Sequence, residues 1–332
     1  MKVLVTGGTG FLGRHLVWRL ASEGHDVGLT GRDASKAREV VSHCARPVTV
    51  IPISHGQPDS EEELRRASTG LDAIVHCAAR SSPWGRRDAF LRANVSSTAE
   101  VLAAIHANGI PRLVHISTPS IYFRFRHCIG VREDDPLPPP VNTYAETKGT
   151  AERMVRASAV PAVILRPRAI FGPWDQTLLP RLLRLMQRRR FPLFNEGAAL
   201  VDLTYVDNVV DAIVLALQAR PSAASTFNIS NGQPIQAGEL FARLARVFGL
   251  PYRPVRMPLA MGMLVARVCE LAARFAPGWE PPLTRYTVGV AAFSQTLDQR
   301  RAREELGYVP RVDLDEGIRR TSDWWRSQPE RR

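Results

Sequence analysis

The feature that most constrains the fold is a glycine-rich stretch near the start of the chain. Lys2 to Thr6 reads as a short valine-rich strand, Gly7-Gly8-Thr9-Gly10-Phe11-Leu12-Gly13 follows directly, and apolar residues continue to Leu20 at helical spacing. Glycine permits a tight turn and a close approach of the backbone to a pyrophosphate, which the helix N-terminus then faces. The pattern predicts a dinucleotide site formed by Gly7, Thr9, Gly10, Phe11, Leu12 and Gly13.

Short apolar runs recur along the chain and are mostly separated by helical stretches. They lie at positions 27–30, 48–53, 73–77, 113–116 and 162–165. This alternation predicts an α/β fold with a doubly wound parallel sheet, a Rossmann fold, whose ligand lies at the C-terminal strand ends. We expect residues 1–170 to form this domain, with 203–232 returning to it. Residues 171–202 and 233–332 would form a smaller, mostly helical substrate-binding region.

Composition limits the classes of protein to which the chain can belong. Of 332 residues, 44 are basic and 32 acidic, which gives a formal net charge of +12, yet no block of like charge resembles a nucleic-acid-binding arm. The cysteines lie far apart and form no CxxC pair, and the apolar run at the N-terminus is too short for a signal peptide. We therefore expect a cytoplasmic protein with reduced thiols, no metal site and no nucleic-acid partner.

The residues after the second strand bear on which dinucleotide binds. A carboxylate there would hold the ribose hydroxyls of NAD, but Gly31 occupies the position and Arg32 follows it. Arg32, with Lys36 and Arg38 nearby, offers donors to a 2′-phosphate, so we favour NADP(H) over NAD(H). Asp33 is the counterargument, because NAD stays viable if the turn directs this carboxylate inward.

A tyrosine and a lysine four residues apart are the candidate chemical groups. Tyr144 and Lys148 would face the same way on a helix, and the chain has only two other lysines. The Lys148 ammonium, together with a positively charged nicotinamide, would lower the phenol pKa so that Tyr144 can exchange a proton with a substrate oxygen. Lys148 could also hold the nicotinamide ribose. The plain structural alternative is an exposed helix pair.

The strand at 113–116 runs into hydroxyl residues where the nicotinamide should lie, and one hydroxyl should polarise a carbonyl group. In this order the glycine loop, this strand and the Tyr144/Lys148 pair resemble the extended short-chain dehydrogenase/reductase superfamily, which includes NAD-dependent epimerases and dehydratases. Further matching stretches are His76-Cys77-Ala78-Ala79, Asn94-Val95 with Thr98, Arg166-Pro167, Phe171-Gly172-Pro173, Tyr205 to Val209 and Leu306 to Pro310.

The resemblance implies roles for further residues. Thr118, four residues before Tyr122, matches the family's catalytic hydroxyl, and Asn94 matches a helix-located Asn with a structural and proton-relay role, although it could also be a helix cap. Cofactor contacts are implied for Ala78, Ala79, Pro167, Ala169 and Ile170. The chain departs from the pattern at Ile51 to His55, where no acidic residue is available for adenine, and at Phe123, where a glycine is usual.

Three segments, at 81–85, 117–122 and 165–171, look most like the 3β-hydroxysteroid dehydrogenase branch, which includes 2-alkyl-3-oxoalkanoate reductases. This resemblance implies hydride transfer between NAD(P) and a small hydrophobic ketone or alcohol, either a β-hydroxy acid or a 3β-hydroxysteroid, with Tyr144 as the acid or base. Apolar walls would come from Trp84, Phe123 and Trp174, and Arg168 would meet a carboxylate, as could Arg124 or Arg126.

Two other functions remain open from the sequence. A nucleotide-sugar epimerase, dehydratase or reductase would use the same residues and grip a pyrophosphate, for which Arg181, Arg184 and Arg188 to Arg190 are available. A non-catalytic cofactor-binding protein is the second alternative, and retention of Thr118, Tyr144 and Lys148 argues against it. The family also implies a homodimer formed through helices near Asn94 and Tyr144.

A helix is expected at 258–275, where the residues are apolar except for Arg267, Glu270 and Arg274. Met261, Leu264, Val265, Val268 and Leu271 cover the rest of its surface. The simplest interpretation is a helix packed on the body of the protein. A lid over an apolar substrate or a peripheral contact with a membrane surface is the alternative.

Overall fold

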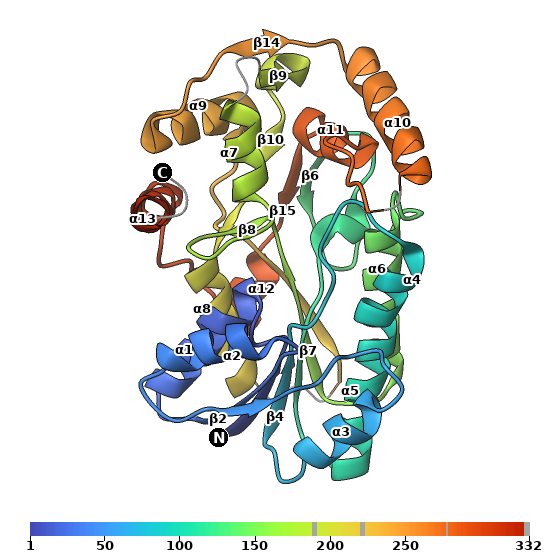
Figure 1. Ribbon diagram of the computed structural model, residues 1–332, viewed down its shortest axis with the longest axis vertical. Coiled ribbons are helices and arrows are strands. Elements are labelled where there is room, and N and C mark those ends of the chain that lie inside the picture. The colour runs from blue at the N-terminus through green and yellow to red at the C-terminus, as the bar shows by residue number, and fades with distance from the viewer. Residues whose placement is uncertain (188–190, 220–222, 277, 329–332) are drawn as a thin grey trace.

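A parallel sheet of seven strands, in the order β12-β7-β5-β4-β1-β2-β3, forms the centre of the larger domain (Figure 1). The computed structural model describes residues 1–187, 191–219, 223–276 and 278–328. The strands are β1 (Lys2–Thr6), β2 (Asp26–Thr30), β3 (Thr49–Ile51), β4 (Ala73–His76), β5 (Leu113–Ile116), β7 (Ala162–Pro167) and β12 (Ser225–Ile229). The strand order reverses between β1 and β4, so the ligand crevice lies at their C-terminal ends. The expected doubly wound fold is confirmed.

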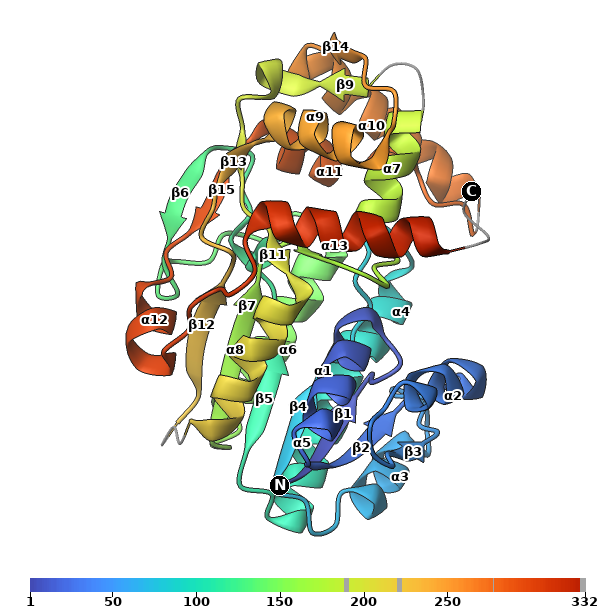
Figure 2. The ribbon, with the colours of Figure 1, turned by 90° about the vertical axis from the view of Figure 1, so that its left-hand side faces the viewer.

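Helices cover both faces of this sheet because side chains alternate along its strands. Val3 and Val5 enter one hydrophobic core, and Leu4 enters the core on the opposite face. The first face is covered by α1 (Phe11–Ser22), α2 (Ala34–Ser42), α8 (Val206–Gln218) and α12 (Arg300–Leu306), and the second by α3 (Ser60–Ala67), α5 (Ser97–Asn108) and α6 (Thr143–Ala157) (Figure 2). The short helix α4 (Arg87–Phe90) continues through a π-helical turn, Leu91–Ser96, into α5.

The second region lies beyond the C-terminal strand ends. Its four-stranded sheet has the order β13 (Ile235–Gln236), β10 (Leu200–Val201), β15 (Gln295–Leu297) and β6 (Cys128–Val131). Two strand pairs accompany it, β8 (Ile170–Phe171) with β11 (Thr204–Tyr205), and β9 (Phe191–Leu193) with β14 (Pro254–Arg256). Its helices are α7 (Leu179–Gln187), α9 (Ala237–Phe248), α10 (Leu259–Phe275), α11 (Arg285–Ala292) and α13 (Leu314–Ser327). Short 3-10 turns occur at Pro119–Tyr122 and Phe194–Gly197.

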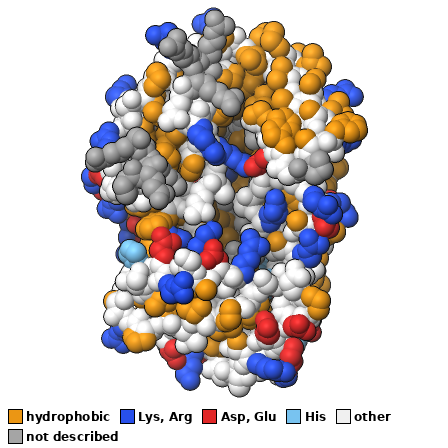
Figure 3. Space-filling view, viewed as in Figure 1, with side chains coloured by type: hydrophobic (Ala, Val, Ile, Leu, Met, Phe, Trp, Pro, Cys, Tyr) orange, Lys and Arg blue, Asp and Glu red, His pale blue; other side chains and the backbone are white. Residues whose placement is uncertain are grey.

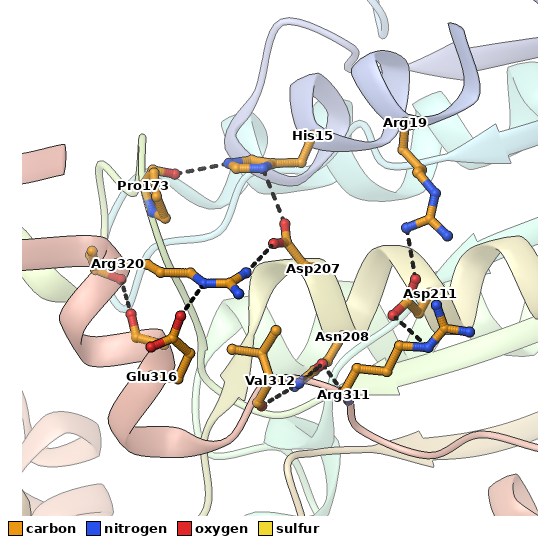
Figure 4. Close-up of polar contacts among 12 residues, drawn as sticks. His15, Arg19, Pro173, Asp207, Asn208, Asp211, Arg311, Val312, Glu316 and Arg320 are labelled. Carbon is orange, nitrogen blue, oxygen red and sulfur yellow. Dashed lines mark hydrogen bonds and ion pairs between the residues drawn. The ribbon is translucent and has the colours of Figure 1, made fainter. Parts of the chain in front are cut away.

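The first turn of α8 ties the two regions together (Figure 4). The Asn208 side chain accepts hydrogen bonds from the backbone N–H groups of Arg311 and Val312, both at 3.0 Å, and donates one to the Val312 carbonyl at 2.7 Å. Asp207 lies 3.6 Å from His15 of α1 and 3.7 Å from Arg320 of α13. The stretch from Tyr205 to Val209 therefore positions α13 rather than contributing to a chemical site.

The helix expected at 258–275 is α10. Most of its large apolar side chains are exposed, unlike those of a helix whose apolar face covers a core. Gly262, Ala266 and Ala273 are its buried residues, whereas Leu264 and Val268 are exposed. The fully buried contacts of α10 thus come from small side chains, and the partly buried Leu259 and Met263 pack beside them. Across the described ranges, no helix is both long and apolar enough to cross a membrane.

Candidate active site

The glycine loop forms a tight cradle between β1 and α1. Gly7 has a φ of +67°, and a Cβ there would lie 2.8 Å from the Cα of Ala78. A Cβ at Gly13 would collide with the Gly7 carbonyl oxygen. No side chain caps the N-terminus of α1 at Gly10, so its backbone N–H groups face the crevice. These features fit a bound pyrophosphate, as the sequence predicts for residues 7 to 13.

The end of β2 has no room for an acidic side chain. A Cβ at Gly31 would collide with the Thr9 side chain. Asp33 instead caps α2, where its carboxylate accepts hydrogen bonds from the backbone N–H groups of Ser35 at 3.0 Å and Lys36 at 3.2 Å. Arg32 is exposed beside this helix start. The carboxylate that could bind a ribose is therefore engaged in capping, and a guanidinium stands next to it.

Tyr144 and Lys148 occupy the first turns of α6, which Asn142 caps by accepting a hydrogen bond from Ala145 N at 2.8 Å. Lys148 is 2% exposed, and its Nζ donates to the Ile116 carbonyl at 2.6 Å. Burial lowers the pKa of Lys148 to about 8, although Glu152 and Cys77 oppose this shift. The lysine is thus held at the end of β5, on the cofactor side of the site.

The Tyr144 phenol is placed among hydroxyl groups. Burial raises the pKa of Tyr144, while hydrogen bonding with Thr118 and Ser81 lowers it. Thr118 is 6% exposed and caps the turn Pro119–Tyr122, with its Oγ1 3.1 Å from Ser120 Oγ. The structure therefore brings Thr118 and Tyr144 together, as the sequence analysis expected.

Tyr286 of α11 is a site residue that the sequence analysis missed. Its hydroxyl lies 2.8 Å from Ser120 Oγ, and its ring packs edge-on against Phe123, with centroids 5.2 Å apart. Tyr286 also lies close enough to Tyr144 and Arg168 to affect the pKa of each. No motif singles out this tyrosine, because α11 reaches the site only through the tertiary fold.

Arg168 lies just beyond β7 and is 5% exposed. Burial lowers the pKa of this guanidinium, and its Nε has no hydrogen-bond partner. Asp202 partly offsets the effect of burial on Arg168, but its Oδ2 accepts a hydrogen bond from Ser230 Oγ at 2.7 Å. A buried guanidinium of this kind is costly unless an anion joins it, so the site is suited to a negatively charged group.

A second buried arginine, Arg166, has a structural role that the sequence did not reveal. It forms an ion pair with Glu152 of α6, both of them almost fully buried, and donates a hydrogen bond to the Tyr122 hydroxyl. Ser117 Oγ donates to Glu152 at 2.7 Å, and Tyr122 donates to Asn228 at 3.0 Å. This network fixes α6, and hence Tyr144 and Lys148, against the sheet.

Asn94 is buried in the π-helical turn and does not cap a helix. Its Oδ1 accepts a hydrogen bond from Arg80 N at 2.7 Å, and its Nδ2 donates to Thr147 Oγ1 at 2.9 Å and, more weakly, to the Arg80 carbonyl at 3.4 Å. It thus joins the segment after β4 to α6. The interpretation of Asn94 as a helix cap is wrong, while its role in proton relay stays a prediction.

The other predicted cofactor residues lie at C-terminal strand ends. Ala78 and Ala79 follow β4, and Ala78 N donates to Thr6 Oγ1 at 3.3 Å. Pro167 ends β7, Ala169 follows with a φ of +42°, and Ile170 begins β8. All of these positions border the crevice that the strand order defines.

The structure separates the three predicted apolar wall residues. Phe123 is 2% exposed and packs behind Tyr286, and Trp84 is half-buried in the loop before α4. Trp174 instead packs against Trp18, Trp324 and His43, with the Arg14 guanidinium 4.5 Å from its ring. This places Trp174 in a cluster with α1, α2 and α13, apart from Phe123, and its role as a wall of the substrate site stays a prediction.

The basic residues proposed for substrate anions also differ in position. Arg124 donates to the Pro136 carbonyl at 2.7 Å, and Arg126 is exposed. Arg181 forms an ion pair with Glu280, and the Nε of Arg184 donates to the Pro180 carbonyl at 3.2 Å. Arg188 to Arg190 lie outside the described residues. Among these candidates, Arg168 has the burial expected of a ligand-binding guanidinium.

The fold and these residues define a dinucleotide-binding protein with a hydroxyl-rich site at the strand ends. The sequence of residues 3–230 matches the NAD dependent epimerase/dehydratase family. The chain belongs to this family, and the resemblance seen in its motifs is confirmed.

Relatives extend over nearly the whole chain. A 2-alkyl-3-oxoalkanoate reductase of Stenotrophomonas maltophilia (strain K279a) is 35% identical over 96% of this chain and 98% of its own. The 3beta-hydroxysteroid-dehydrogenase/decarboxylase isoform 1 of Arabidopsis thaliana is 29% identical over 96% of this chain and 78% of its own. The solved structure of MoeE5 in complex with UDP-glucuronic acid and NAD is 25% identical, with a TM-score of 0.76 over 98% of this chain and 99% of that chain.

Proposed function

We propose that the protein is an NADP(H)-preferring oxidoreductase that interconverts a hydrophobic β-hydroxy acid, or a 3β-hydroxysteroid carrying an acid group, with its ketone. The observation that carries the proposal is the buried Arg168, which lacks a partner at Nε and lies near Tyr286, the residue that also adjoins Tyr144. A carboxylate next to the reacting carbon would join this guanidinium while the carbonyl oxygen meets the hydroxyl groups. The names of the relatives favour the same class of substrate.

The chain's own residues account for the proton side of the reaction. The ketone oxygen would accept hydrogen bonds from Thr118 and Tyr144, and Tyr144 would give up its proton as the alcohol forms. When bound, the dinucleotide supplies the hydride and, in its oxidised form, a positive charge. Lys148, held by the Ile116 carbonyl, stands where it can stabilise a phenolate and the ribose. Reversal of these steps oxidises the alcohol.

The preference for NADP(H) rests on the end of β2. Gly31 leaves no space for an acidic side chain, and Asp33 is engaged as the cap of α2. The Arg32 guanidinium favours an anion, and Lys36 and Arg38 add positive charge on α2. A 2′-phosphate supplies that anion, whereas the nearest carboxylate for the ribose of NAD, that of Asp33, already caps α2 through Oδ1.

The test is NADPH oxidation by the purified protein with a panel of ketones, and NADH in parallel. The panel contains a 2-alkyl-3-oxo acid, its methyl ester, a 3-ketosteroid and a UDP-4-keto-sugar. We expect turnover of the oxo acid, with kcat/KM for the ester at least tenfold lower because the ester lacks the charge for Arg168. Arg168→Met should remove the difference between acid and ester.

Two results would contradict the proposal. Turnover of the UDP-4-keto-sugar alone would assign the site to nucleotide sugars, the class of ligand bound in MoeE5. Unchanged activity of Tyr144→Phe on its best substrate would remove the phenol from the reaction, since a positioned acid contributes about 10²–10⁴-fold. Binding of NADPH measured by fluorescence would show that each variant keeps a folded cofactor site.

A further inference from the structure

Helix α10 presents a continuous apolar face to solvent. Leu264 is 62% exposed, Val268 57% and Phe275 87%, and the same face includes Met261, Val265 and Leu271. At 3.6 residues per turn, these positions fall within one arc of roughly 120° along the helix. Figure 3 shows hydrophobic side chains gathered over this helix at the edge of the molecule. A contiguous patch of this kind marks an interaction surface more often than scattered exposed residues do.

The face of α10 opposite to the exposed one is already packed against the protein. The opposite side of α10 carries Gly262, Ala266 and Ala273, which are buried. A Cβ at Gly262 would collide with the Phe194 ring, and Ala266 packs in one cluster with Val288 of α11. The helix therefore lies close against the protein through small side chains, with the partly buried Leu259 and Met263 beside them, while most of its large apolar side chains face solvent.

Positive charge borders the apolar arc. Arg267 and Arg274 are exposed on one flank of it. The one acidic residue of the helix, Glu270, is bound to Arg285 at 2.8 Å. Other nearby carboxylates are also engaged, since Glu280 pairs with Arg181 and Glu196 pairs with Arg256. Arg267 and Arg274 thus place positive charge along one side of the exposed apolar face of α10.

We propose that α10 docks the protein on the surface of an anionic lipid bilayer. The apolar arc would enter the boundary between headgroups and acyl chains, and Arg267 and Arg274 would meet lipid phosphates. The contact is peripheral, because no helix of the described residues can span a bilayer. Charge complementarity favours an anionic bilayer as the partner. The apolar arc matches the acyl-chain boundary of such a membrane, and the arginines beside it match the negatively charged headgroups.

The docked face lies one helix away from the candidate active site. Glu270 of α10 binds Arg285 of α11, and the next residue, Tyr286, reaches Ser120. An apolar substrate dissolved in the bilayer would therefore be near the site. This consequence rests on the proposed function, whereas docking itself does not depend on the reaction.

The test is co-sedimentation of the full chain with large unilamellar vesicles, one set of phosphatidylcholine with phosphatidylglycerol and one of phosphatidylcholine alone. We expect binding to the anionic vesicles that weakens at least tenfold without phosphatidylglycerol. Leu264→Glu/Val268→Glu and Arg267→Glu/Arg274→Glu should each lower the partition coefficient by roughly tenfold or more. Ile129→Glu is the matched control, because Ile129 is 61% exposed on β6, away from this helix, and should bind as the parent does.

We expect the variants to have the same melting temperature as the parent protein, because the substituted side chains are exposed. Equal values would show that the variants are folded. Absence of vesicle binding by the parent protein, or binding by both α10 variants that equals that of the parent, would overturn the proposal. So would a concentration-dependent dimer in sedimentation velocity that Leu264→Glu/Val268→Glu abolishes, when no vesicles are bound. That result would assign the apolar face to a second copy of the chain. None of these measurements requires enzymatic activity. A negative result would therefore contradict membrane docking without contradicting the proposed function.

Discussion

The hydroxyl groups of Ser120 and Tyr286 lie 2.8 Å apart, although 166 positions separate the two residues in the chain. Ser120 follows β5 of the large sheet, and Tyr286 belongs to a helix of the smaller region. The contact places a second phenol beside Thr118 and Tyr144, at the boundary between the two regions. It gives the site a wall that comes from the smaller region, separate from the glycine loop and from the Tyr144/Lys148 pair.

Tyr286→Phe tests this wall. Loss of the hydroxyl removes one neutral hydrogen bond, so we expect the KM of the ketone to rise about three- to tenfold while the KM of NADPH stays constant. The measurement is steady-state kinetics with each substrate varied in turn. Tyr252→Phe is the matched control, because its hydroxyl is only 3.4 Å from the Gly238 carbonyl, at α9. An equal KM change in both variants would argue against a contact between Tyr286 and substrate.

Lys148 should make both activity and stability depend on pH. Burial lowers the pKa of Lys148 in the folded protein to about 8, against 10.5 for a freely exposed lysine. Between these values the unfolded chain binds the extra proton, so the contribution of Lys148 to the free energy of unfolding rises with pH across this window. Below about pH 8 that contribution is constant and unfavourable.

Activity should follow the opposite trend. The ammonium form is lost as pH rises through about 8, and ketone reduction should then decline. Lys148→Met should flatten the part of the stability profile that lies between pH 8 and 10.5 and should reduce activity at every pH. Urea denaturation and initial rates, both measured from pH 6 to 10, would check this. A parent protein whose two profiles match those of the variant would contradict the prediction.

Glu152→Ala should destabilise the protein strongly. Burial alone would raise the pKa of Glu152, but Arg166 and Ser117 lower it overall, so the ion pair is charged at neutral pH. Removing the carboxylate leaves the buried Arg166 without its partner, which costs about 3–5 kcal/mol in free energy of unfolding. The double variant Glu152→Met/Arg166→Met should recover a large part of this loss. Urea titration measures each value, and a loss below about 1 kcal/mol in Glu152→Ala would show that the network is dispensable.

Arg32→Ala should change the choice of cofactor. Loss of a charge-assisted hydrogen bond to a 2′-phosphate corresponds to roughly 10- to 100-fold in the KM of NADPH, with the KM of NADH nearly constant. Arg46→Ala is the control, because Arg46 is exposed near Gly24, before β2, at the end opposite to Arg32. If NADH is already the better cofactor of the parent protein, the preference for NADP(H) is wrong.

The sequence by itself determined the local parts of this protein. Hydrophobic periodicity and the glycines from Gly7 to Gly13 predicted the strands, the doubly wound sheet and the phosphate cradle, because these depend on backbone geometry and on neighbours along the chain. The spacing of Tyr144 and Lys148 places both on one helix in the same way. Strand ends meet at one edge of a parallel sheet, so a hydroxyl after β5 could be assigned to the site, and the resemblance to the family selected Thr118.

Only the tertiary structure decided which distant side chains meet. Trp174 packs with Trp18 instead of Phe123, Tyr286 reaches Ser120, and Asp33 is taken by the start of α2. Amphipathic periodicity also could not tell which face of α10 is buried, because its small side chains allow the closer approach and most of its large apolar ones stay outside. These outcomes depend on the packing of segments far apart in the chain, and spacing along the sequence carries no information about such contacts.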